Sequence, residues 1–567
     1  MQLLRGLVVG VFCLSVIQSV FAGVTIEEVA GVDSSNQAGW WIPLAIHDGD
    51  SYFSFNSPGS SNSKHKVKVA KRNSSGVWVS GFLKNADGSI WEHSDDNGHD
   101  QPTIAVDGDG DIHVFADHHN DSWRYFRSSS PTDINNLLRR NDIINVGGIY
   151  TYPIAATSPN GDIYMIVRDT NGSDVGKGQL LYWNNNTNEW SFIGTFASQT
   201  NTRVYPDDLV VDSNGDVHII WEWAYGHPRA DRHYGSYLKY EPNTGLFKTV
   251  DGNTVSTPVS LSTPNIFYQG LESGESFTSA DTGKGIQTAK LALGSTGRPS
   301  IVYRFRTDEI SSGGRDYEVF RIRWNGTGWV DKTSIYSAQD TIAALGHTIV
   351  GDRVRAYFVS NDKQLHVAEK TGGSAWASYI LSPNKSIERV NVKVKDTNED
   401  VVYASAPTSV NSNSGKLYAL FVDSDLTDIP EPVVPTVYEA EDLYFTNTAT
   451  VSILSDVSAS EGKYVMLQDN TVNDWVEFTL PNVEVGTYTV KYSYKTHSIR
   501  GIAKSGYEGT DFATSVDQYN AAVSWPMTIL GTINVATAGD KLLRFTVEGK
   551  NPSSSGYKIS IDKIVLE

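Results

Sequence analysis

Two stretches of the 567-residue chain share one pattern: HDQPTIAVDGDGDIHVFADHH at residues 99–119 and YPIAATSPNGDIYMIVR at residues 152–168. Each begins with a titratable side chain shortly before a proline, continues through an apolar strand and a Gly-Asp turn, and ends on a side chain that can carry positive charge. Short apolar runs on both sides of a tight turn are typical of a β-hairpin. The two stretches are therefore successive copies of one hairpin.

The same hairpin recurs along the chain, which is the sign of a repeat architecture. Most copies are followed by a second hairpin that ends on an aromatic residue, and two hairpins per repeat make a four-stranded blade. Seven blades close radially and leave no long exposed strand edge. The sequence thus predicts an all-β fold with a seven-bladed β-propeller over residues 23–425. The further copies lie at 43–55, 206–223, 289–305, 347–360 and 390–406, and the aromatic residues are Trp78, Trp190, Phe247, Trp329 and Trp376.

Residues 1–22 have the layout of a cleavable secretory signal, with Arg5, an apolar run at 7–17 and small residues before position 23. No other stretch is long and apolar enough to span a bilayer. The only cysteine, Cys13, lies in this segment, so the mature chain would have neither disulfides nor thiol chemistry. We therefore expect a secreted monomer, extracellular or periplasmic.

The formal net charge is −19 and is spread along the chain. Such a charge argues against general binding to nucleic acid or to a membrane. It does not argue against an anionic substrate, because charge acts locally. Within a Debye length of about 8–10 Å, a few Arg and His side chains in a cleft outweigh distant carboxylates.

A Pro-rich, acidic segment at residues 426–437 is expected to be a linker, and a second β-unit follows at 438–567. This unit resembles the calcium-binding β-sandwich (jelly-roll-like) carbohydrate-binding modules, which open with an acidic pair like Glu439 and Glu441 and close on a strand with an acid like Asp562. The resemblance implies a structural calcium held by these three carboxylates. Exposed acids on ordinary strands are the alternative.

Charged residues recur in one column of the repeat. When the repeats are aligned on their turns, four of them place a charged residue after the apolar core of the second strand, where a core would not tolerate it. We expect this column to line a channel or rim. Polar ends of equivalent strands in adjacent blades would then converge on one mouth. The column holds Asp117, Arg168, Glu222 and Arg304, and His99, Tyr152 and Tyr205 precede the first strands.

These residue types match the needs of β-elimination from a uronic acid. A cation must neutralise the carboxylate, a base must remove the C5 proton, and an acid should protonate the leaving oxygen at C4. Arginine offers a planar fork for the carboxylate. Histidine can serve as base or acid, whereas tyrosine needs an adjacent cation to serve as a base.

The order of four residues on adjacent repeats, His99, His119, Tyr152 and Arg168, resembles that of the seven-bladed propeller ulvan lyases, BNR-repeat-like enzymes secreted by marine bacteria. The resemblance covers roughly residues 35–425. It implies cleavage of a sulfated algal polysaccharide between 3-sulfated rhamnose and a uronic acid, which leaves a 4,5-unsaturated uronate.

The resemblance also assigns roles. His99 and Tyr152 would be the proton-transfer pair, and Arg168 with His119 would neutralise the uronate, although His118 competes with His119 for this place. Which member of the pair is the base stays open. Expected substrate contacts are Asp100, Arg203, Tyr205 and Arg232, with solvated loop charges as the alternative for the two arginines.

No organic cofactor is expected, and zinc is an open question. Some relatives hold a structural zinc with Cys and His ligands, and the mature chain would contain no cysteine. A different ligand set would then be needed. His227 and His233 are the candidates, with ordinary loop histidines as the alternative.

Two other functions compete with a lyase. A sialidase-type propeller glycosidase also binds carboxylates through arginines, but the chain contains no clean S-x-D-x-G-x-x-W box. A non-catalytic lectin or adhesin would only hold polysaccharide with its propeller and sandwich. The chemistry of the product separates the three hypotheses.

Overall fold

The structure is a computed structural model in which the chain divides into two compact units, Met1–Glu431 and Pro432–Glu567. Each unit is described by itself. His99, most of the expected signal segment and most of the expected linker lie outside the described residues. These are 19–21, 23–32, 40–61, 64–94, 100–143, 148–171, 176–226, 232–278, 284–306, 317–338, 344–360, 363–383, 385–406, 414–426, 436–468, 471–483 and 485–566.

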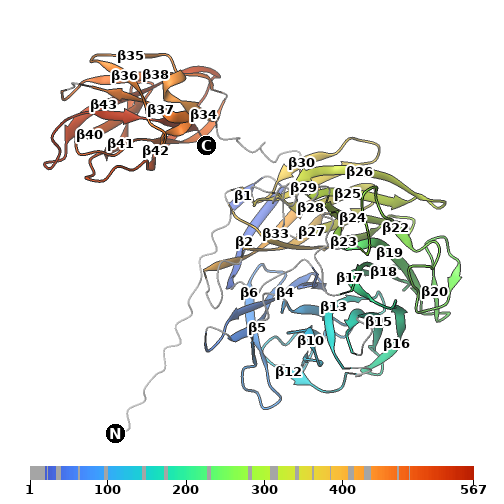
Figure 1. The fold of residues 1–567 in the computed structure, drawn as a ribbon. Coiled ribbons are helices and arrows are strands. Elements are labelled where there is room, and N and C mark those ends of the chain that lie inside the picture. Colours follow the sequence, from blue (N-terminus) through green and yellow to red (C-terminus); the bar gives the residue numbers. More distant parts are fainter. Residues whose placement is uncertain are drawn as a thin grey trace, which may run out of the picture. The chain divides into compact units, whose positions relative to one another are not determined.

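Within its described residues the first unit contains seven four-stranded antiparallel blades (Figure 1). Blade 1 consists of β3 (Leu44–His47), β4 (Asp50–Pro58), β5 (Lys64–Arg72) and β6 (Trp78–Lys84) with β7 (Glu92–Ser94), and blade 2 of β8 (Thr103–Val106), β9 (Ile112–Phe115), β11 (Tyr125–Ser128) and β12 (Leu137–Arg140). Blade 3 consists of β13 (Tyr150–Thr157), β14 (Ile163–Asp169), β15 (Lys177–Asn184) and β16 (Glu189–Ala197) with β10 (His119–Asp121). Blade 4 consists of β17 (Thr202–Val211), β18 (Val217–Tyr225), β19 (His233–Glu241) and β20 (Leu246–Lys248) with β21 (Thr254–Val255) and β22 (Phe267–Gln269). Blades 5 to 7 are β23 (Gly285–Leu293), β24 (Pro299–Arg306), β25 (Tyr317–Trp324) and β26 (Trp329–Ala338); β27 (Leu345–Val350), β28 (Arg353–Val359), β29 (Leu365–Thr371) and β30 (Ala377–Ile380); and β31 (Arg389–Val394), β32 (Glu399–Ala406), β33 (Gly415–Asp423) and β2 (Val24–Val32) with β1 (Ser19–Phe21).

The blades form a closed ring. Their first strands contact one another in the order β3, β8, β13, β17, β23, β27, β31 and back to β3. The start of the chain completes blade 7, because β2 pairs with β33 along its whole length (Figure 1). Closure therefore uses ladder hydrogen bonds, and the predicted all-β propeller is confirmed.

A second link joins blades 1 and 2. Strand β12 pairs in parallel with β6, with Leu137 opposite Leu83 and Leu138 opposite Lys84. The two blades thereby share one nine-stranded sheet. This link fixes the outer edge of blade 2 to its neighbour.

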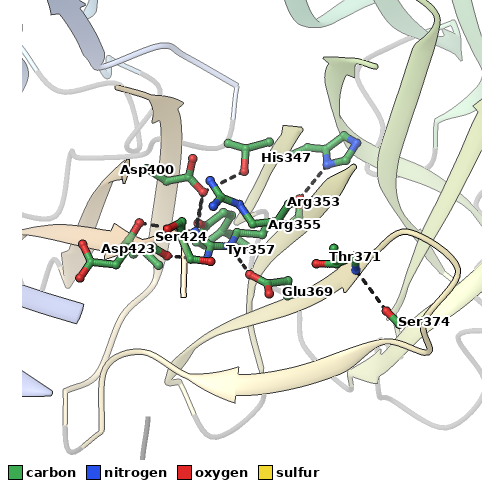
Figure 2. Close-up of polar contacts among 12 residues, drawn as sticks. His347, Arg353, Arg355, Tyr357, Glu369, Thr371, Ser374, Asp400, Asp423 and Ser424 are labelled. Carbon is green, nitrogen blue, oxygen red and sulfur yellow. Dashed lines mark hydrogen bonds and ion pairs between the residues drawn. The ribbon is translucent and has the colours of Figure 1, made fainter. Parts of the chain in front are cut away.

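Blades 6 and 7 are joined by a buried network around Arg355 (Figure 2). The Arg355 guanidinium donates to a carboxylate oxygen of Asp400 at 3.0 Å, to Glu369 at 2.6 Å and to the backbone carbonyl of Asp423 at 2.5 Å. Tyr357 donates its hydroxyl to the same Asp400 oxygen at 2.5 Å. Because Arg355 lies on β28 and Asp400 on β32, this network holds two adjacent blades together.

The second unit is a β-sandwich around one apolar core, which includes Phe478, Tyr492 and Phe545. Its three sheets have the strand orders β34-β45-β39-β42, β35-β38-β43-β40-β41 and β36-β37-β44. No helix in the described parts of either unit is long and apolar enough to cross a membrane. The elements are β34 (Thr436–Glu439), η2 (Ala440–Asp442), β35 (Phe445–Asn447), β36 (Val451–Ser455), η3 (Ser460–Gly462), β37 (Lys463–Leu467), β38 (Trp475–Val483), β39 (Gly486–Ser493), β40 (Gly501–Tyr507), β41 (Thr510–Asp517), β42 (Met527–Val535), β43 (Gly539–Lys550), β44 (Ile559–Ile561) and β45 (Lys563–Leu566).

Candidate active site

A backbone irregularity recurs where the first strands of blades 3 and 4 begin. The register of β13 against β14 shifts between Thr151 and Ile154, and that of β17 against β18 shifts between Pro206 and Asp208. Tyr152 has a φ of 58°, which is rare for a bulky residue and is typical of functional sites. The irregularities allow the two tyrosines before the prolines to approach each other, with ring centroids 5.8 Å apart.

The Arg168 guanidinium contacts both of these rings. Its guanidinium carbon is 4.7 Å from the ring centroid of Tyr152 and 4.6 Å from that of Tyr205. The residue is 1% exposed, and its Nε and Nη1 have no hydrogen-bond partner among the described residues. A buried cation with unused donors is costly unless an anion joins it, so this position is prepared for a carboxylate.

A second guanidinium contacts Tyr205 from the next segment of the chain. Arg232 is 3.9 Å from the Tyr205 ring centroid and 4.8 Å from that of Trp40. Its Nη1 is 3.6 Å from a carboxylate oxygen of Glu222, the residue opposite Tyr205 in the β17–β18 ladder. Two cations and two phenols therefore form one buried group.

The phenols of this group differ in acidity. Burial raises the pKa of Tyr152 and outweighs the neighbouring positive charge of Arg168. Burial acts in the same direction on Tyr205, but there the charges of Arg168 and Arg232 prevail and lower the pKa below its ordinary value. The two tyrosines share these cations, so the positive charge that stabilises a phenolate acts on both of them.

Two carboxyl groups lie behind Arg232. Asp207 and Glu222 are fully buried. Burial and the charge of Glu222 raise the pKa of Asp207 far above its ordinary value, and burial raises that of Glu222 against the charge of Arg232. Burial therefore favours the protonated form of this pair, which reduces the negative charge beside Arg232.

His119 and Arg203 complete the cluster. Strand β10 pairs with β13 so that His119 lies opposite Thr151, and its ring centroid is 6.3 Å from that of Tyr152. Arg203 is only partly buried, and its pKa is lowered by burial and by the charge of Arg168. Trp41 packs edge-on against Tyr152 at 5.1 Å and closes the apolar side.

The structure thus brings six of the predicted site residues together. The six are His119, Tyr152, Arg168, Arg203, Tyr205 and Arg232. His99 lies outside the described residues, and Asp100 is fully buried beside His93 and Asp117. Their expected roles stay predictions.

Four further members of the cluster were not predicted as site residues. Glu222 belongs to the charged column found in the sequence, and Asp207 follows Tyr205 and its proline. Both residues could therefore have been predicted from the repeat pattern. The Trp40–Trp41 pair precedes the first repeat and belongs to no column. Only the fold brings these two rings to Tyr152.

A separate cavity lies away from this cluster. It measures about 810 Å³ and is lined by Asp208, Lys290, His347 and Lys393, together with the hairpin turn at 212–214. That turn follows the end of β17, whereas Tyr205 is near its start, so the cavity opens toward the opposite end of the inner strands. We place the candidate site at the tyrosine–arginine cluster because that cluster carries the unpaired cation and the perturbed phenols.

Comparison with known proteins agrees with the blade architecture. A model of BNR repeat-containing family members matches residues 39–336, which is more than half of the chain. The chain belongs to the BNR repeat-containing family. The matched region spans blades 1 to 5 and includes every member of the tyrosine–arginine cluster.

Two ulvan lyases are similar in sequence to part of this chain. An ulvan lyase (PL25) of Pseudoalteromonas sp. (strain PLSV) is 24% identical over 329 residues, 51% of this chain and 62% of the relative. An ulvan lyase of Alteromonas sp. (strain LOR) is 21% identical over 361 residues, 57% of this chain and 70% of the relative. The chain therefore aligns with less than two thirds of the length of the first relative.

A solved structure shows the same fold. The PL25 ulvan lyase bound to -[GlcA(1-4)Rha3S]- has a TM-score of 0.54 at 16% identity, and the match covers 73% of this chain and 98% of the other. At this identity the likeness establishes the propeller fold alone. The place of the substrate in this chain has to be argued from its own residues.

Proposed function

We propose that this chain is a polysaccharide lyase that cleaves ulvan, a sulfated polysaccharide containing uronic acid, by β-elimination. The observation that carries this proposal is that the Arg168 guanidinium contacts two phenol rings and has two donors that lack partners in the described residues. A uronate carboxylate would fill those donors. The names of the two relatives support the choice of ulvan as substrate.

The proposed reaction needs no external reactant. Arg168, assisted by His119, binds the uronate carboxylate and so makes the C5 proton acidic. A base removes that proton, the electron pair forms the C4–C5 double bond, and the C4–O bond breaks. An acid returns a proton to the leaving oxygen. The products are a 4,5-unsaturated uronate and a new free hydroxyl.

In this proposal His99 and Tyr152 are the proton-transfer pair, and Tyr205, expected from the sequence as a substrate contact, is a further candidate for proton transfer. Its pKa is lowered and it contacts both arginines, so the phenolate left on either tyrosine is stabilised by the same two cations. Arg203, at the partly exposed side of the cluster, is proposed to hold the sulfate of the neighbouring sugar. The substrate contact expected of Asp100 stays a prediction, because its side chain is fully buried.

Incubation of the full chain with ulvan tests this proposal. A lyase produces far-ultraviolet absorbance from the unsaturated uronate and adds no oxygen from labelled water. A glycosidase gives a saturated product that carries the label, and a lectin leaves the polymer intact. A labelled saturated product, or no product from ulvan and other polyuronates, would refute the lyase.

The charge of Arg232 is expected to set the pH dependence of this reaction. Arg232 lowers the pKa of both phenols, so Arg232→Gln raises the pKa of whichever phenol loses its proton. The rising limb of kcat/KM should therefore move to higher pH. Arg232→Lys retains the charge and is the matched control, and an unshifted limb in Arg232→Gln would remove the two tyrosines as the base.

We propose that the second unit is a carbohydrate-binding module with one structural calcium held by Glu439, Glu441 and Asp562. Its support is that Glu439 Oε2 and Glu441 Oε2 are buried without partners, and that burial raises the pKa of all three carboxyl groups. The carboxylate oxygens of these three side chains are not grouped as closely as the ligands of one ion. Backbone carbonyl oxygens or waters would therefore complete the calcium coordination shell.

Chelation is expected to destabilise this module selectively. Calcium binding to the folded state alone stabilises it by about 2.7 kcal/mol at a hundredfold excess over Kd. In thermal unfolding of the full chain, calcium chelation should lower the transition of the module and leave that of the propeller unchanged. The variant Glu441→Gln should abolish this response; an equal response in variant and wild type would contradict the site.

We also propose that the chain is secreted, on the basis of the signal-like residues 1–22. An extracellular location fits a polymer too large to enter a cell. Determination of the N-terminal residue of protein recovered from culture medium tests this proposal. A mature chain starting at Gly23 is expected.

A further inference from the structure

Three metal-ligating side chains meet at the junction of blades 1 and 2. His93 lies on β7, Asp100 precedes β8 and Asp117 follows β9. One ligand atom from each lies within 4.8 Å of the other two. The residues are 4%, 0% and 6% exposed, so the cluster is shielded from solvent.

The distances within this cluster are unusual for direct hydrogen bonds. Nδ1 of His93 is 3.6 Å from Oδ2 of Asp100 and 3.6 Å from Oδ1 of Asp117. A hydrogen bond from nitrogen to oxygen spans about 2.7–3.2 Å. Around a tetrahedral zinc with bonds of about 2.0–2.2 Å, neighbouring ligand atoms are about 3.3–3.6 Å apart. The two separations from His93 therefore fit atoms arranged around an ion, and the two carboxylate oxygens lie within 4.8 Å of each other.

We propose that His93, Asp100 and Asp117 bind one zinc-class divalent transition-metal ion, with water in the fourth position. An imidazole ligand favours zinc over calcium or magnesium, which prefer oxygen. The outer oxygen of Asp117 is 3.1 Å from Nε of Arg124, a contact that orients a ligating carboxylate. These three ligands do not include His227 or His233, the zinc candidates from the sequence. His227 lies outside the described residues, and His233 contacts Glu275.

A proton is the competing occupant of this site. Burial acts to lower the pKa of His93, but the carboxylates of Asp100 and Asp117 raise it to about 9. Two buried carboxylates need a counter-charge, and a protonated His93 supplies it when no metal is bound. Only a measurement of bound metal separates these two states.

The position of the site gives the ion a structural role. Asp100 directly follows His99 in the sequence, and Asp117 precedes His119 by two residues. His119 in turn lies opposite Thr151 at the start of β13. The ion would fasten two blades at the point where the chain leads into the candidate active site. This role does not depend on the proposed lyase activity.

Zinc content tests the inference directly. The full chain is stripped with chelator, refilled with zinc in excess calcium, dialysed, and analysed by inductively coupled plasma mass spectrometry. Wild type should retain one zinc per chain, and His93→Gln and Asp117→Asn should lose it. The matched control is His218→Gln, because His218 is a buried histidine beside a single carboxylate, Asp212, and this variant should retain its zinc.

Equal zinc in wild type and in His93→Gln would overturn the inference, whether both values are high or both are zero. Circular dichroism first establishes that each variant is folded. If His93→Gln and Asp117→Asn do not fold, anomalous scattering at the zinc edge from wild-type crystals decides. A peak between the three side chains supports the site, and its absence rules the site out.

Discussion

Replacement of Arg168 by alanine is expected to reduce kcat/KM on ulvan by about 10²–10³-fold, because the variant loses the cation that stabilises charge developing on the uronate. The same change should leave the melting temperature unchanged or raise it. Two donors of this buried guanidinium have no partner in the described residues, so its removal relieves a desolvation cost. Loss of activity without loss of stability would mark Arg168 as a functional residue rather than a structural one.

Two variants sharpen this experiment. Arg168→Lys retains the charge but not the planar fork, so it should recover only part of the activity. Arg304→Ala is the matched control, because Arg304 occupies the equivalent position in blade 5 and donates to Gln287 at 2.7 Å. Near-normal turnover by Arg168→Ala, or an equal loss in Arg304→Ala, would contradict the assigned role.

The change Asp400→Asn is expected to lower the free energy of unfolding of the propeller by about 3–5 kcal/mol, because it leaves Arg355 without its buried carboxylate partner. Asp400 and Arg355 are both fully buried, and one Asp400 oxygen accepts bonds from Arg355, Tyr357 and Thr348 (Figure 2). An amide cannot accept all three at the same strength. The loss falls on the contact between blades 6 and 7.

Urea unfolding of the full chain measures this effect, and the transition of the second unit serves as an internal reference. Glu369→Gln is the matched control. This variant removes the other carboxylate partner of Arg355. Because the Glu369 side chain is 16% exposed, the loss of unfolding free energy should be about 1 kcal/mol. A loss in Asp400→Asn no greater than that of the control would show that the network does not stabilise ring closure.

Much of the propeller was predictable because its pattern is local. Each inner hairpin is recognisable from alternating apolar residues on both sides of a turn. All seven copies found in the sequence form the first two strands of a blade. Ring closure by β2 was not predictable in the same way. The pairing of Val24 with Val422 joins residues almost four hundred positions apart, and no local pattern encodes it.

The candidate site was likewise predictable only in part from the sequence. The sequence by itself determined which residue types would stand at the ends of adjacent strands, since the period of a repeat fixes which positions are equivalent. Only the tertiary structure decided that Arg168 contacts both Tyr152 and Tyr205, that Arg232 reaches Tyr205 as well, and that Trp40 and Trp41 close the cluster. The reason is physical: order along a strand follows from local backbone geometry, whereas acidity and unsatisfied donors arise from burial and from charges that distant segments bring together.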